Sequence, residues 1–307
     1  MGINDRSVSG SETKQVAGSG SIGFQRVLVA IDFSEQSRQA LRLAVMIAQE
    51  FGSELHLVHA ATPFVYETAT EGIPIEVLHA NLDAAKVQMA QWIEAEPGLK
   101  AQTPQTTVAY ASAVDLIEQL AKEESAALIV VGSHGARGLE RLVLGSVAEA
   151  AMRRVRCPVL IVGPKYQAVS KPFQSIVLAT SMTLGELRAA EYAAGLVERF
   201  HGTLTLLHVL AAQSSDPQMQ PELIAAHLER ELERLLPSNV GHACSTKARV
   251  EYGAAGDVIA SVAREEGAGL VVVGLHERAT LADHAWWSTL STVIREVECA
   301  VFSVGGQ

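Results

Sequence analysis

The sequence predicts an α/β protein made of two tandem copies of one domain, each a parallel sheet covered by helices. Short apolar strand patterns alternate with amphipathic helix patterns along the chain, which indicates right-handed crossovers and a parallel sheet. The same landmarks then recur in the same order in both halves. The length of 307 residues fits two domains of ordinary size.

The internal repeat is visible in matched residues at constant separations. Three pairs lie 142 residues apart: Tyr110 and Tyr252, Gly132 and Gly274, Cys157 and Cys299. Nearer the start of each copy the separation is 149, as between His59 and His208. The difference places a longer connection after the second strand of the first copy, at about Ala61 to His79. A period near 145 indicates duplicated domains, because solenoid repeats are only about 20–50 residues long.

The first copy contains a full set of expected elements. Short apolar runs predict strands at Val27–Ile31, Leu55–His59, Thr106–Tyr110, Leu128–Val131 and Pro158–Val162. Apolar residues at helical spacing predict helices over Ser34–Phe51, Ile75–Glu94, Val114–Glu124 and Ser146–Val155. Gly52 ends the first helix. In the second copy the final strand is expected at Ala300–Val304.

These elements divide the chain into a leader, two domains and a linker. We expect a disordered leader at 1–23, a first domain at 24–164, a linker at 165–172 and a second domain at 173–307. The leader is rich in glycine and serine and has no apolar core, so it does not resemble a signal peptide.

Composition narrows the possible partners. The formal net charge of −10 disfavours nucleic acid and anionic membranes. No apolar run approaches the ~20 residues needed to span a bilayer. Three cysteines do not resemble a secreted disulfide framework. We therefore expect a cytoplasmic protein.

One loop carries the clearest functional signal. The strand Leu128–Val131 is followed by Gly132-Ser-His-Gly135, nine residues, and then Gly145-Ser146. The two glycines allow sharp turns and close approach of a ligand. Ser146 and Glu149 have the spacing of a capping box that opens the next helix. Backbone N–H groups and a helix N-terminus would converge there on an anion, and a polyphosphate is the natural ligand.

Asp32 follows the first strand, at the edge where open parallel sheets bind ligands. Its carboxylate could accept hydrogen bonds from ribose hydroxyls. The alternative is a cap or turn aspartate before the first helix, and position alone does not decide between them.

With these motifs, nearly the whole chain after residue 23 resembles the universal stress protein family of the tandem-domain type. The glycine pattern marks the ATP-binding branch of that family. The resemblance implies a Rossmann-like, adenine nucleotide alpha hydrolase-like domain with five parallel strands, repeated twice, and ATP, with or without Mg²⁺, at the strand ends. It implies a stress-response or regulatory role. The positions it places around ATP are Ala30, Asp32, Ala60, Val131, Gly132, His134, Gly135, Arg137, Gly145, Ser146 and Val147.

The family also implies how the copies assemble. Each final strand should be a sheet edge with unpaired backbone groups. In the family two such strands pair antiparallel about a two-fold axis. Within a tandem chain this gives an intramolecular pseudo-dimer with Val159, Ile161, Val301 and Ser303 near the axis. A homodimer of whole chains is a further possibility, and the sequence does not identify a protein partner.

The second copy departs from the binding pattern. Glu277 replaces the second glycine, Trp287 stands where Gly145 stands, and Ser181 replaces Asp32. A carboxylate repels phosphates, and we expect the Trp287 side chain to fill the space that a glycine leaves open. The second domain is therefore expected not to bind ATP.

Other readings have less support. No spacing of His and Cys suggests zinc or another metal, and the recurring His59 and His208 resemble strand-end packing. Cys157 and Cys299 resemble small core residues. No catalytic residue is assigned, because the chain lacks a G-x-x-x-x-G-K-[ST] loop and the S-G-G-x-D-S and H-x-G-H motifs of adenylating enzymes. Weak ATP hydrolysis, or a different small ligand in the second domain, remain as alternatives.

Overall fold

The structure is a computed structural model, and it describes residues 22–61, 75–133, 145–183, 186–211, 221–236, 244–275 and 284–305. Residues 1–21 of the predicted leader and residues 134–144 of the loop between Gly132 and Gly145 lie outside these ranges.

The first half alternates strands and helices as expected. Its strands are β1 (Arg26–Ala30), β2 (Glu54–Ala61), β3 (Gln105–Tyr110), β4 (Leu128–Gly132) and β5 (Val159–Val162). Its helices are α1 (Glu35–Phe51), α2 (Ile75–Ala95), α3 (Ala113–Glu123) and α4 (Ser146–Arg154), with a short 3₁₀ helix at Lys100–Gln102. Gly52 ends α1 in the left-handed conformation at φ 66°, as the sequence predicts.

The second half repeats this order. Its strands are β6 (Ser175–Ala179), β7 (Thr203–Leu210), β8 (Ser245–Tyr252), β9 (Leu270–Leu275) and β10 (Ala300–Gly305). Its helices are α5 (Leu187–Arg199), α6 (Pro221–Glu233), α7 (Ala255–Glu265) and α8 (His284–Glu296).

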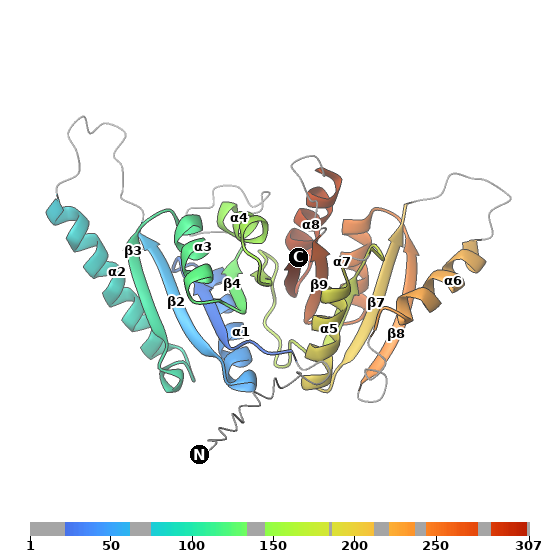
Figure 1. The fold of residues 1–307 in the computed structure, drawn as a ribbon, viewed down its shortest axis with the longest axis horizontal. Helices are drawn as coiled ribbons and strands as arrows, with labels where there is room; N and C mark the ends of the chain where they lie inside the picture. Colours follow the sequence, from blue (N-terminus) through green and yellow to red (C-terminus); the bar gives the residue numbers. More distant parts are fainter. Residues whose placement is uncertain are drawn as a thin grey trace, which may run out of the picture.

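All these strands form one ten-stranded sheet in the order β3-β2-β1-β4-β5-β10-β9-β6-β7-β8. The order is a palindrome, so the two halves lie side by side about an approximate two-fold axis (Figure 1). Pairing is parallel within each half, and β5 pairs antiparallel with β10. Val301 lies opposite Ile161, and Ser303 lies opposite Val159. The predicted antiparallel pairing of the two final strands is therefore confirmed.

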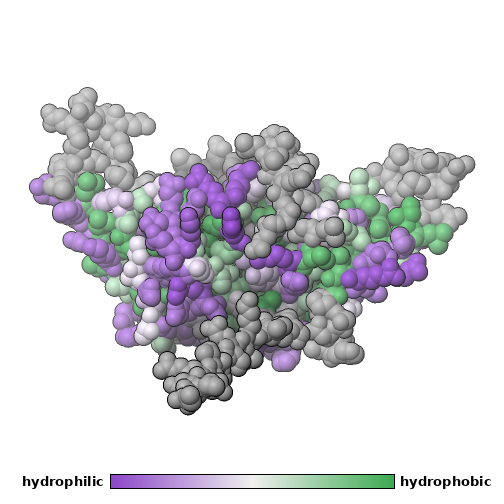
Figure 2. All heavy atoms as spheres, in the orientation of Figure 1, coloured by the Kyte–Doolittle hydropathy of each residue, from purple (hydrophilic) through white to green (hydrophobic). Residues whose placement is uncertain are grey.

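Each face of the sheet has one hydrophobic core that crosses both halves. Residues alternate along the strands, so Val27 and Val29 face α1 and α2 while Leu28 faces α3 and α4. The same cores continue under α5 and α6 on one face and under α7 and α8 on the other. In Figure 2, hydrophilic residues gather over α3 and over the outer helices α2 and α6. This arrangement leaves the carboxyl ends of the strands as the place where loops can build a site.

Aromatic side chains join the halves beneath the shared strands. Phe24 is 1% exposed and stacks on Tyr192 of the second half at 5.9 Å between ring centroids. It also meets Phe302 edge-on at 6.1 Å. Ile22, which the sequence assigns to the leader, packs against Gly195 of α5. The chain is thus already anchored at Ile22.

Candidate functional site

The turn after β1 holds Asp32 at the carboxyl edge of the sheet. Its Oδ1 accepts hydrogen bonds from the backbone N–H of Ser34 at 3.0 Å and from the Ser34 hydroxyl. Ser34 caps α1 by accepting from the N–H of Ser37 at 3.1 Å. Phe33 between them has φ 63°. Asp32 therefore stabilises the turn before α1, and its contact with a ribose stays a prediction.

Neighbouring strands bring the expected adenine-side residues to the same edge. Ala30 ends β1 and Ala60 lies near the end of β2, which pairs with β1 in parallel. Both are partly buried, beside Val131 at 3% exposure. Gly132 ends β4, and a Cβ there would lie 3.0 Å from Cβ of Gln36. The close approach of α1 therefore favours a glycine at this position.

The two described ends of the glycine loop meet directly. The N–H of Gly145 donates to the carbonyl of Ser133 at 2.7 Å, and the N–H of Ser133 donates to Val162 at 2.9 Å. Ser133 is fully buried. The loop is thus closed between β4 and the start of α4. The other predicted loop residues, His134, Gly135 and Arg137, lie outside the described residues.

The predicted capping box is wrong. Ser146 is the first helical residue of α4, and Gly145 is its N-cap, with no side-chain capping bond. Glu149 turns instead to Arg153, whose Nε lies 2.9 Å from its carboxylate. The helix begins after Gly145 because the ψ angle of that residue is not helical, and the Ser-x-x-Glu spacing alone does not fix the first residue of a helix. Gly145 therefore offers no capping side chain to the N–H groups of the first turn.

The remaining predicted residues frame this helix end. Ser146 is exposed, so its hydroxyl is accessible beside the first-turn N–H groups. Val147 is half-buried against the core under α3 and α4. The structure therefore gathers Ala30, Asp32, Ala60, Val131, Gly132, Gly145, Ser146 and Val147 around the carboxyl ends of β1, β2 and β4 and the N-terminus of α4.

The same edge of the second half is built differently. Glu186 is 5% exposed, and its carboxylate accepts from the Thr180 hydroxyl at 2.5 Å and from the Ser181 N–H at 2.7 Å. It contacts Gly274, the counterpart of Gly132, so that a Cβ there would lie 2.6 Å from its Cγ. The sequence alone did not reveal this buried carboxylate, because Glu186 stands at the start of a helix, where acidic residues are common.

Helix α8 also begins earlier than its counterpart. Ser288, which matches Ser146, lies four residues inside α8, and the added turn carries Trp286 and Trp287. Trp286 lines a cavity of about 170 Å³ with Glu186 and His208. Trp287 packs differently from the prediction: its ring lies 3.8 Å from the Arg153 guanidinium carbon of the first half. The side chain that lines the altered site is thus Trp286. Glu277 lies outside the described residues.

Histidines and cysteines at the strand ends have packing roles. His59 Nδ1 lies 2.7 Å from the Ile31 carbonyl, and His208 repeats this with Thr180 at 2.8 Å. Burial raises the pKa of the Cys299 thiol to about 12, and Cys299 is 4% exposed. Within the described ranges no group of three metal-ligating side chains is found. Nor does any helix described there have the length and apolarity to cross a membrane.

The comparisons with known proteins agree with this architecture. A model of the Universal stress protein family matches residues 23–163 and 172–305. Universal stress protein YxiE of Bacillus subtilis is 35% identical over 151 residues, covering 45% of this chain and 99% of that protein. Universal stress protein MJ0531 of Methanocaldococcus jannaschii is 32% identical over 148 residues, covering 45% and 82%.

A solved structure shows the same tandem fold. A universal stress protein from Archaeoglobus fulgidus superposes with a TM-score of 0.66 at 20% identity, covering 92% of this chain and 96% of that one. The likeness extends over both halves, and each half has the Rossmann-like parallel sheet. With both copies matched by the family model, this chain belongs to the universal stress protein family.

Proposed function

We propose that the first domain binds one ATP per chain, with or without Mg²⁺, and that the protein serves a regulatory role in a cytoplasmic stress response. The observation that carries the proposal is the start of α4. Its N-cap, Gly145, has no side chain that could cap the first turn, and the helix start meets the carboxyl end of β4, where the N–H of Gly145 donates to Ser133. Phosphate oxygens are suited to such a helix end, since N–H groups and the helix dipole favour negative charge.

The other predicted contacts follow from this placement. With the phosphates at Gly145 and Ser146, the adenosine extends toward β1 and β2, where Ala30 and Ala60 present small side chains. Asp32 stands at the same edge as an acceptor for ribose hydroxyls. The prediction that His134, Gly135 and Arg137 complete the phosphate loop rests on the sequence pattern.

The second domain should not bind ATP. The buried Glu186 carboxylate lies at its strand ends, and its helix N-terminus is moved by one turn. A carboxylate repels phosphates, and the N–H groups that hold an anion in the first domain are here inside a helix.

A calorimetric titration of the full chain with ATP tests the proposal, and we expect a stoichiometry of one. Gly145→Trp should abolish binding by filling the helix end. Gly145 has φ −58° and ψ 136°, which any residue can adopt, so the fold should persist. Gly145→Ala is the matched control and should retain binding. A stoichiometry of two or zero, or normal binding by Gly145→Trp, would overturn the proposal.

A second candidate is a small non-nucleotide ligand in the second domain, favoured by the cavity of about 170 Å³ beside Trp286. Its lining combines apolar side chains with the polar Thr180, Glu186 and His208, and its volume suits a compact molecule of roughly benzene size. Mass spectrometry of protein purified from cells tests this candidate, and a stoichiometric compact ligand that persists in Gly145→Trp would support it.

A further inference from the structure

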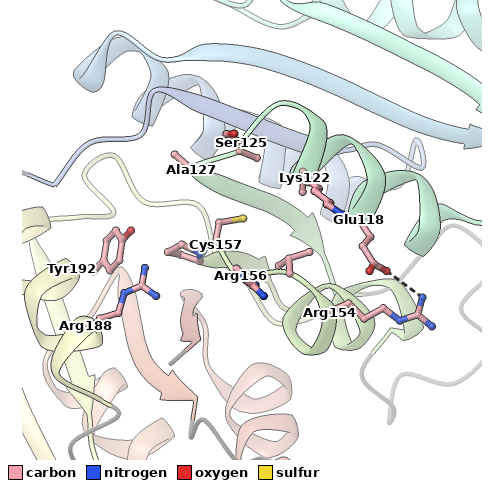
Figure 3. A pocket seen from close by; sticks show the side chains of 13 residues that line it. Glu118, Lys122, Ser125, Ala127, Arg154, Arg156, Cys157, Arg188 and Tyr192 are labelled. Carbon is pink, nitrogen blue, oxygen red and sulfur yellow. Dashed lines mark hydrogen bonds and ion pairs between the residues drawn. The ribbon is translucent and has the colours of Figure 1, made fainter. Parts of the chain in front are cut away.

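A groove between the two halves lies at the amino ends of β4 and β5, away from the carboxyl strand ends of the first domain. It is a cavity of about 670 Å³ between the ends of α3 and α4, the start of β5, and α5 of the second half. Its charged and polar lining includes Glu118, Lys122, Ser125, Arg154, Arg156, Arg188 and Tyr192. Figure 3 shows Arg188 and Tyr192 on α5 facing the first-half residues across this groove. We call it the interdomain groove.

The chain itself occupies the equivalent place in the other half. The linker after β5 crosses the start of β10, where the N–H of Gln167 donates to the Glu298 carbonyl at 2.8 Å. Lys165 forms an ion pair with Glu296 at 2.6 Å. Tyr166 lies near Cys299, and burial raises the pKa of its phenol to about 12. This half therefore shows what a filled groove looks like.

The charges at the two grooves are opposite. By the separation of 142 residues, Arg154 matches Glu296 and Arg156 matches Glu298. In the filled half, Glu296 pairs with Lys165 of the occupant, and Glu298 pairs with Arg264 of its own half at 3.7 Å. Where arginines stand, a complementary occupant must be negatively charged.

Most of the cations in the interdomain groove lack acidic partners. The exception is Arg154, which forms ion pairs with Asp115 at 2.9 Å and with Glu118 at 3.4 Å. Within the described part of the chain, Lys122 and Arg156 form no ion pair, and Arg188 donates to one acceptor there, the Gly305 carbonyl at 3.2 Å. Such a cluster is unexpected on a protein with a net charge of −10, because scattered cations would pair with the excess of carboxylates.

We infer that the interdomain groove binds a small, multiply charged anion, which Arg156 of the first half and Arg188 of the second half hold together. Guanidinium groups present paired donors that match phosphate and carboxylate oxygens. The volume lies within the range of ordinary small-molecule sites. A phosphorylated metabolite and a polycarboxylate share this chemistry. Because the groove spans both halves, its ligand is a contact between them that is separate from the ATP site.

The test is a calorimetric titration of the full chain at low salt, with pyrophosphate and with citrate as probes. The test variant is Arg156→Gln/Arg188→Gln. The matched control is Arg230→Gln/Arg234→Gln, which removes the same charge from the exposed surface at the end of α6. We expect the test variant to lose at least ten-fold in affinity for one probe site, while the control changes less than two-fold.

The outcomes separate this inference from the proposal of ATP binding. Preference for pyrophosphate would support a phosphorylated ligand, and preference for citrate would support a polycarboxylate. ATP binding to the first domain should be unchanged in the test variant, which melts like the wild type. The inference is overturned if neither probe binds the wild type, if the control loses as much affinity as the test variant, or if the test variant binds both probes normally.

Discussion

Gly163 gives the most direct test of how closely the two halves are packed. It follows β5, and a Cβ at this position would lie 2.2 Å from the carbonyl oxygen of Ile294 in α8. Ordinary van der Waals contact begins at 3.4 Å, so Gly163→Ala requires backbone to move by about 1 Å. Both sides resist this movement, because Ile294 is 1% exposed and Gly163 accepts a bond from Tyr166. Overpacking against backbone of this kind costs about 2–3 kcal/mol.

The duplication supplies a matched control. Gly305 is the counterpart of Gly163 by the separation of 142, and a Cβ there meets nothing within 4 Å. Unfolding in urea, followed by the fluorescence of Trp92 in one half and of Trp286 and Trp287 in the other, reports on both halves. We expect Gly163→Ala to lower the urea midpoint, and the melting temperature by roughly 4–8 °C, while Gly305→Ala stays near the wild type. Equal midpoints for the two variants would refute the close packing of Gly163 against α8.

Three further predictions concern the site and the thiols. Asp32→Ala should weaken ATP binding about ten-fold, because it removes an acceptor for the ribose hydroxyls. Ser181→Ala changes the second-half counterpart and should leave ATP binding unchanged. If calorimetry gives the two variants equal affinities for ATP, Asp32 does not belong to the site. ATP turnover should stay below about one per second, because the sequence lacks the G-x-x-x-x-G-K-[ST] loop that supplies a phosphate-clamping lysine; faster phosphate release in a steady-state assay would contradict this. Burial raises the pKa values of Cys157 and Cys299 to about 11 and about 12 from 9.0. As the pH rises, the unfolded chain therefore loses these thiol protons before the folded chain does, so the free energy of unfolding should be highest below pH 9 and fall toward pH 11. Urea midpoints measured at pH 8 and 10.5 will show this fall. A Cys157→Ala/Cys299→Ala variant should show a smaller fall, and an equal fall would assign the effect to other groups.

Much of the fold was predictable because burial on both faces gives each strand a short continuous apolar run. The expected strand Leu128–Val131 and helix Ile75–Glu94 each end within one residue of β4 and α2. The antiparallel pairing of β5 with β10 came from family resemblance, since an apolar edge strand does not specify its partner.

The candidate site was less predictable, because single residues decide its details. Glycine spacing pointed to the end of β4, yet the ψ angle of Gly145 moved the helix cap by one residue. Glu186 occupies the second-half site from a neighbouring helix start, and no spacing rule distinguishes a buried carboxylate there from an exposed one. The two tryptophans are compatible with a helix or a loop, so the added turn of α8 could not be read from them.

The pairing of β5 with β10 inside one chain has a consequence for symmetry. When two identical chains associate through such strands, both sites carry the same sequence, and every substitution appears twice. A tandem chain joins its halves at a high effective concentration that dilution cannot lower. Each half can then diverge without losing its neighbour, and the Glu186 site has diverged while β10 still completes the shared sheet. Covalent fusion thus permits an asymmetric molecule on a symmetric framework.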